Sequence, residues 1–102
     1  MKVEQIESVV AVEDGLPPLQ AMVYEELLRR KDEVFPYQGD ELLQVFPQMK
    51  RSAMNWTLWL LAKNGQIGKM RLRLRGRVTT VYGSHEALEL LREHIRQEAG
   101  LA

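Results

Sequence analysis

The sequence predicts a single α+β domain that is mainly helical, and three observations predict it. Apolar residues recur at helical spacing in several stretches, which are separated by breaks containing proline or glycine. Between residues 69 and 82 the pattern changes to strict alternation and then to β-branched residues, which is typical of strands. The chain of 102 residues, 45% of them hydrophobic, suits one domain with a modest core.

Residues 1–17 are expected to be an N-terminal extension to a domain at 18–102. Helical spacing fits the first part of residues 2–12, whereas the later valines favour a strand, so both types stay open. The segment Glu13–Pro18 contains Gly15 and two prolines, and it separates the extension from the domain.

The first helix of the domain is expected from Pro18 to about Arg30, because proline is tolerated in a first turn. Two ion pairs in the favourable i,i+4 order are expected on its outside, Glu25–Arg29 and Glu26–Arg30. One stripe of this helix is apolar and should face the core: Leu19, Met22, Val23 and Leu27.

Two helices joined by a short turn are expected next, after an extended segment at 34–37. Asp40 is a candidate N-cap for a brief helix from Glu41 to Phe46, which Pro47 ends. Ser52 is a candidate cap for a helix from 53 to 64, and Gly65 is suited to the C′ position that follows. This arrangement is a helix-turn-helix candidate.

A β-hairpin and a last helix complete the domain. In 69–75 cations alternate with Met70, Leu72 and Leu74, which predicts a strand with the apolar residues inward and the cations outward. Gly76 permits a tight turn into a second strand at 77–82, which Gly83 ends. Ser84 should cap a helix from 85 to about 97, with one apolar side: Leu88, Leu91 and Ile95.

The charges of the chain are strongly segregated. Residues 43–84 contain eight Lys and Arg residues and no Asp or Glu. The ten acids and four bases of residues 1–41, and the four acids and two bases of 86–102, make the flanking segments acidic, although the net charge is zero. Such a basic block indicates a polyanionic partner, nucleic acid above all. The alternative is a solvated strand face balanced by acids elsewhere.

This order of elements is that of winged helix-turn-helix domains, and the sequence resembles that superfamily over roughly residues 18–97. Within Lys50–Ile67, the spacing of Met54, Leu58, Leu61 and Gly65 is similar to that of the family's recognition helix. The resemblance implies a three-helix core, a β-hairpin wing and a C-terminal helix. It also implies that the helix starting at Ser52 enters the major groove of DNA with its N-terminal residues first.

The resemblance also implies roles for individual residues. Arg51 and Asn55 have the hydrogen-bonding geometry to read guanine and adenine edges, and Ser52 would hold a phosphate. Alternatively Ser52 is only a cap and Asn55 a solvated side chain. Cations of the wing would contact phosphates or the minor groove, unless they pair with the acidic N-terminal region. The predicted DNA-binding residues are Lys50, Arg51, Ser52, Asn55, Lys63, Lys69, Arg71, Arg73, Arg75 and Arg77.

Trp56 and Trp59 depart from the family pattern, because these positions are commonly polar or basic in recognition helices. They make the helix apolar nearly all round, which usually means burial on more than one side. We expect them to pack under the N-terminal segment, to fill a dimer contact, or to lie against DNA sugars.

Catalysis is not expected. The chain has no cysteine and two histidines, His85 and His94, which are expected to be solvated or to cap a helix. No phosphate-binding loop or nucleophile elbow is present, so we expect no enzyme, no metal site and no cofactor. Without a signal peptide or an apolar run of about 18 residues, the expected location is cytoplasmic, with no membrane span.

The function predicted from these features is that of a small transcriptional regulator or repressor that binds double-stranded DNA as a homodimer. Two half-sites raise affinity and specificity together, and residues 2–12 and the C-terminal helix are left to form the dimer contact. A protein-interaction module that uses Trp56 and Trp59 to bind a partner subunit is the alternative. RNA or single-strand binding along the basic strands is a weaker third option.

Overall fold

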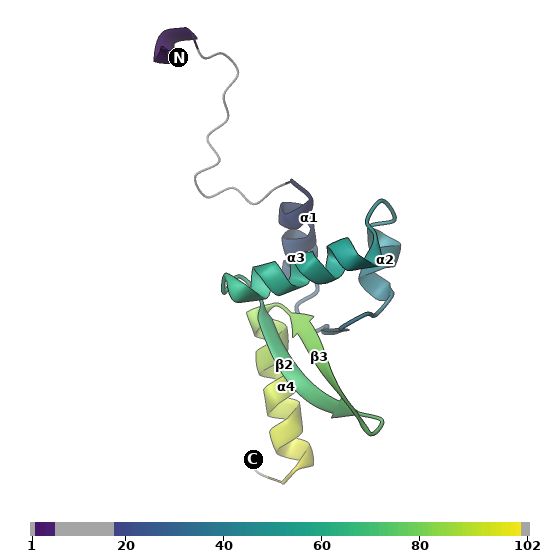
Figure 1. The fold of residues 1–102 in the computed structure, drawn as a ribbon. Helices are drawn as coiled ribbons and strands as arrows, with labels where there is room; N and C mark the ends of the chain where they lie inside the picture. Colours follow the sequence, from purple (N-terminus) through teal and green to yellow (C-terminus); the bar gives the residue numbers. More distant parts are fainter. Residues whose placement is uncertain (1, 6–17, 101–102) are drawn as a thin grey trace.

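The computed structural model describes residues 2–5 and 18–100 of the chain (Figure 1). It confirms the α+β class, with four α-helices and a three-stranded antiparallel sheet in these residues. Whether the N-terminal extension forms a strand or a helix was left open, and most of its residues lie outside the described part of the chain. In order, the elements are η1 (Val3–Gln5, one turn of 3₁₀-helix), α1 (Pro18–Arg29), β1 (Phe35–Pro36), α2 (Glu41–Val45), α3 (Arg51–Lys63), β2 (Gly68–Leu74), β3 (Arg77–Gly83) and α4 (His85–Glu98).

The sheet has the order β1-β3-β2, so the short first strand pairs with the last one. In the hairpin the register runs from Gly68 opposite Gly83 to Leu74 opposite Arg77. Arg75 and Gly76 form a two-residue turn with φ of 50° and 81°, the positive values that a type I′ turn requires. The prediction that Arg75 belongs to the strand is therefore wrong, because the turn takes two residues.

The main core lies where α1, α2 and α3 meet the end of the sheet. The helical and strand periods predict that Met54, Leu58 and Leu61 are buried with Leu27, Leu43 and Met70. Met54, Leu58, Leu61 and Leu27 are indeed buried together, and Leu43 packs against them while partly buried. Met70 was also expected in this core, but it lies on the opposite face of the sheet. Six further members of this core were not predicted: Phe35, Leu42, Phe46, Met49, Ile67 and Tyr82.

The apolar stripe of α1 is only half buried in the core. Val23 and Leu27 are fully buried, but Leu19 and Met22 are 39% and 49% exposed, contrary to prediction. Periodicity marks the apolar stripe of a helix, but α3 and the sheet cover only the side that carries Val23 and Leu27. Of the two predicted ion pairs, Glu26–Arg30 forms at 2.9 Å, whereas Arg29 pairs with Glu26 and not with Glu25.

A second, smaller apolar contact joins α4 to the sheet. Gly68 and Gly83 are partners in the hairpin, and a Cβ atom on either would lie 3.0–3.1 Å from Leu88. The two glycines therefore let the first turns of α4 lie close against the sheet. Gly83 is the last residue of β3, so the strand ends one residue later than predicted. Ser84 caps α4 as predicted, because its hydroxyl accepts a hydrogen bond from the backbone N–H of Ala87 at 3.1 Å.

The two ends of α3 differ in how well they were predicted. At its C-terminus Gly65 has the predicted positive φ of 76°, and the bonds Gln66 N–H to Leu61 C=O and Gly65 N–H to Ala62 C=O make a Schellman motif. At its N-terminus the cap residue is Lys50, so the prediction that Ser52 caps the helix is wrong. The extended backbone of Lys50 already lets its carbonyl accept from Met54, and Ser52 becomes part of the first turn.

Candidate nucleic-acid interface

The β-hairpin has two faces with different neighbours. Residues with the parity of Gly68 and Val81 face α4, where Leu88 lies against the glycines. On the other face the register pairs Lys69 with Tyr82, Arg71 with Thr80 and Arg73 with Val78. Since side chains alternate between the faces of a strand, the three cations of β2 share one exposed face.

Arg75 and Arg77 do not belong to that face. Arg75 lies in the turn at the tip of the hairpin, and Arg77 is opposite Leu74, on the side of the sheet that carries α4. The prediction that the hairpin presents its cations on one outer surface therefore holds for Lys69, Arg71 and Arg73 only. A two-residue turn makes this split, because it pairs residue 74 with residue 77.

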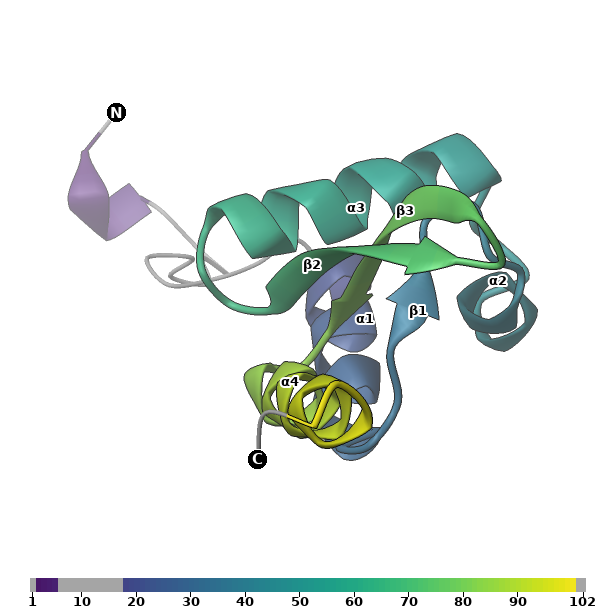
Figure 2. The same cartoon turned by 90° about the horizontal axis from the view of Figure 1, so that it is seen from below.

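Helix α3 also presents a side that no other described element covers. Opposite the buried Met54, Leu58 and Leu61, it carries residues at helical spacing that are exposed or partly exposed: Ser52, Asn55, Trp56, Trp59 and Lys63. In Figures 1 and 2, α3 and the hairpin lie on one side of the molecule, and α1 and α4 lie on the other. We call the uncovered side of α3 together with the Lys69–Arg73 face of the hairpin the open face.

The two tryptophans lie on the open face, contrary to the expectation of burial on more than one side. Trp56 is 58% and Trp59 is 38% exposed. Their rings stack on each other, with centroids 5.0 Å apart and planes at 25°. The ammonium group of Lys63 lies 4.9 Å from the centroid of the Trp59 ring, within the range of a cation–π contact. Packing under residues 6–17 falls outside the described part of the chain.

A shallow hollow of about 440 Å³ opens beside the tryptophans. Tyr82 forms part of its floor, and burial raises the pKa of this phenol above its ordinary value, with a smaller contribution from Tyr37. Neither tyrosine was predicted as a site residue. The signal for Tyr37 was its place directly after a short strand, where side chains often contribute to a site. The residues that line the hollow are Tyr37, Ser52, Asn55, Trp56, Trp59 and Tyr82.

Arg51, the predicted guanine reader, is engaged within the protein. Its guanidinium group donates to the backbone oxygen of Gln38 and to the carboxylate of Asp40. Gln38 has a φ of 64°, unusual for a residue with a side chain, and Arg51 thus holds the loop before α2 in this conformation. Asp40 occupies the N-cap position of α2, as predicted, but its carboxylate makes this ion pair and no side-chain cap.

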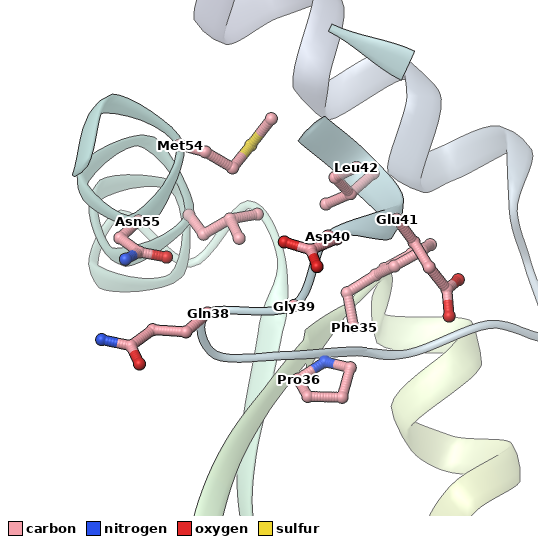
Figure 3. Close-up of a pocket in the computed structure, with 10 residues that line it drawn as sticks. Phe35, Pro36, Gln38, Gly39, Asp40, Glu41, Leu42, Met54 and Asn55 are labelled. Atoms are coloured by element: carbon pink, nitrogen blue, oxygen red, sulfur yellow. The ribbon is translucent and has the colours of Figure 1, made fainter. Parts of the chain in front are cut away.

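A small cavity lies between the same loop and α3 (Figure 3). Its volume of about 100 Å³ is below the roughly 300–1,000 Å³ of sites that hold small ligands. Asn55, the predicted adenine reader, lines both this cavity and the hollow and is partly exposed. Of the two predicted readers, only Asn55 makes no side-chain hydrogen bond among the described residues.

The remaining cations of the basic block are not neutralised in the described part of the chain. Within residues 2–5 and 18–100, the ion pairs of the block are limited to Arg51 with Asp40. In α1 and α4, Glu26 pairs with Arg29 and Arg30, Glu89 with Arg92, and Glu93 with Arg96. The alternative prediction, in which acidic residues balance the hairpin, therefore gains no support from the described acids.

The described residues give little support for a metal site or a membrane span. Among them there is no group of three or more His, Asp or Glu side chains that could hold a metal ion. His85 has a structural contact, because its Nε2 lies 2.8 Å from the carbonyl oxygen of Gly65 and joins the start of α4 to the end of α3. None of the described helices combines the length and the apolarity needed to cross a membrane.

Comparison with known proteins adds no relative. No protein-family model, no curated protein and no solved structure matches this chain.

Proposed function

We propose that this chain is a winged-helix DNA-binding protein, in which α2 and α3 form the helix-turn-helix and the β2–β3 hairpin forms the wing. The element order and the sheet order β1-β3-β2 support the proposal, since both agree with the layout of that superfamily.

One observation carries the proposal: cations from two elements share the open face, and within residues 2–5 and 18–100 none of them pairs with a carboxylate. Lys63 comes from the end of α3, and Lys69, Arg71 and Arg73 come from β2. Neutralisation of phosphates by such side chains releases counterions and supplies a large part of the affinity for nucleic acid. No acidic side chain lies in residues 43–84, so nothing in this stretch repels a phosphate backbone.

The mode of binding follows from the same arrangement. The start of α3 would enter the major groove, where Asn55 has the paired donor and acceptor that recognise adenine. Arg51 would have to exchange its bonds to Gln38 and Asp40 for a base, so we assign it first to holding the loop. Ser52, in the first turn and exposed, is suited to contact a phosphate.

Regulation by a homodimer that occupies an operator is the fuller form of the proposal. One module of this size contacts a limited stretch of DNA, and a dimer doubles the contact. Helix α4 offers exposed apolar side chains for a contact with a second copy, Leu90 and Ile95.

The experiment is a salt titration of duplex DNA binding with variants on the two faces of the hairpin. Arg71→Ala and Arg73→Ala should each flatten the slope of log K against log salt by about 0.9, if each removes one phosphate contact. Arg77→Ala, on the α4 side, is the matched control and should change the slope much less. Equal effects of the three variants, or binding that does not depend on salt, would contradict the assignment of the open face.

A protein-interaction module is the second candidate, and the exposed tryptophan pair favours it. Aromatic side chains are enriched at the centre of protein interfaces, where tryptophan is a frequent anchor. This candidate predicts no selectable DNA site and no salt-dependent DNA affinity. The salt titration therefore separates the two functions.

A further inference from the structure

We propose that the open face takes an unpaired nucleotide, with its base stacked on the Trp56–Trp59 pair, so that the preferred ligand is duplex DNA with unpaired bases beside it. This inference rests on the proposed DNA binding and specifies which DNA the site prefers. It gives the two tryptophans a role that reading of a closed duplex does not require.

The chemistry of a closed duplex explains why the tryptophans need a different ligand. In paired DNA the faces of the bases are covered by their neighbours, and a helix in the groove meets only base edges and phosphates. Side chains such as Asn55 can form hydrogen bonds with base edges. An indole ring, in contrast, binds mainly by stacking its large flat surface on the face of a base. An unpaired base exposes its face, and stacking on an aromatic side chain contributes about 1–3 kcal/mol per base.

The geometry of the pair suits stacking. Trp59 is held between two contacts, with the Trp56 ring at 5.0 Å and the Lys63 ammonium at 4.9 Å. Trp56 is the more exposed of the two, at 58%, and offers the free surface. Because the two rings already lie against each other, a base that extends the stack orders few additional side chains.

The surroundings of the pair suit a nucleotide better than an apolar protein segment. The hollow beside the rings holds the hydroxyl of Ser52 and the amide of Asn55, polar groups that can bind the edge of a base. Lys63 contacts Trp59 itself, and Lys69 is the register partner of Tyr82 on the floor of the hollow. Aromatic rings with cations beside them are the usual composition of single-strand sites, where the cations follow the backbone.

The size of the hollow is also adequate. Its volume of about 440 Å³ falls within the roughly 300–1,000 Å³ of small-ligand sites, and it is open to one side, as a base attached to a strand requires. Arg73 lies farther along the open face and Arg75 lies in the turn at the tip of the hairpin, so both can hold the neighbouring duplex by its phosphates.

The test compares three DNAs at one salt concentration: a blunt duplex, the same duplex with a short oligothymidine overhang, and the oligothymidine alone. Affinity is measured by anisotropy of labelled DNA, and the emission of the protein is recorded in the same titration. The chain has two tryptophans, both in the proposed site, so its emission reports on that site directly. We expect the overhang to raise affinity about tenfold, equal to about 1.4 kcal/mol, and to quench the emission.

Variants separate stacking from other effects. Trp56→Ala should bring the ratio of overhang to blunt affinity close to one, and Trp56→Phe, which keeps an aromatic face, should retain most of it. Met22→Ala is the matched control, because it removes a side chain of similar exposure from α1, away from the open face. Circular dichroism and thermal melting of each variant check that the fold is kept.

The outcomes distinguish this inference from the proposed function. Equal affinity for blunt and overhang DNA, with salt-dependent binding to both, would overturn the stacking role and keep the proposed function. A ratio that survives in Trp56→Ala would do the same. No binding to any of the three DNAs would overturn both and leave the tryptophan pair to a protein partner.

Discussion

The two sides of α3 carry side chains of comparable apolarity and have opposite environments. On one side Met54, Leu58 and Leu61 are at most 3% exposed, and on the other Trp56 and Trp59 are 58% and 38% exposed. An apolar side chain is therefore expected to be in contact with other groups, but its apolarity does not show whether these belong to the core or to the surface. The first three contact α1, α2 and the sheet, whereas the tryptophans contact each other and Lys63.

The hairpin repeats this contrast at the level of the sheet. Its α4 side is closely packed at Gly68 and Gly83, and its other side is an exposed row of cations that continues from the open side of α3. One side of each element therefore holds the fold together, and the other is free to bind.

Leu58→Ala should lower the free energy of unfolding by about 2–5 kcal/mol, because it removes a fully buried side chain and leaves a cavity. Trp56→Ala on the same helix should change it by about 0.5 kcal/mol or less, although it removes more atoms. Urea denaturation of both variants measures the difference. A loss for Trp56→Ala as large as that for Leu58→Ala would mean that the open side also stabilises the fold.

Gly83→Ala should cost about 1–3 kcal/mol, because the new Cβ would lie 3.1 Å from Leu88 and from the backbone oxygen of Glu33. Arg71→Ala on the exposed side of the hairpin should stay within about 0.5 kcal/mol of the unchanged protein. Thermal melting of the two variants compares the two sides of the sheet. Unchanged stability in Gly83→Ala would show that α4 can move away from the sheet at little cost.

Asn55→Ala should narrow the free-energy gap between a selected operator and random DNA by about 1–3 kcal/mol. Affinity for random DNA should change little, because an uncharged side chain contributes little to counterion release. The measurement requires an operator obtained by selection and two titrations at one salt concentration. Equal losses on both DNAs would mean that Asn55 does not read bases.

Ser84→Ala should cost about 1 kcal/mol, because it removes the hydroxyl that accepts from the N–H of Ala87 at the start of α4. Ser52→Ala offers a matched comparison, since the sequence gives both serines the appearance of a cap and only Ser84 makes the bond. Its effect on unfolding should be a few tenths of a kcal/mol. A similar cost for both would indicate that α3 can begin at either residue.

Much of the fold was predictable from the sequence because it depends on neighbours along the chain. The alternation in 69–74 identified a strand, Gly65 identified the end of α3, and Ser84 identified the start of α4. These features depend on hydrogen bonds and backbone angles within a few residues. The start of α3 was predicted at the wrong residue because Lys50 makes no side-chain cap. Residue type does not identify an N-cap that acts through its backbone alone.

The candidate site was predictable in its charge and only partly in its geometry. The sequence alone shows that the residues around α3 and the hairpin are basic and free of acids, because this follows from composition. It also determined that one side of α3 carries leucines and another carries tryptophans, because that follows from helical spacing.

Which of these sides is covered depends on how the elements pack in three dimensions. The two-residue turn sets the register that places Arg71 and Arg73 on one face and Arg77 on the other, and the docking of α1 and α4 leaves that face open. The packing of the elements also brings Tyr37 and Tyr82 beside Trp56, although these residues are far apart in the sequence. Register and docking depend on contacts between segments that are distant in the sequence. A local residue pattern does not show which of these contacts will form.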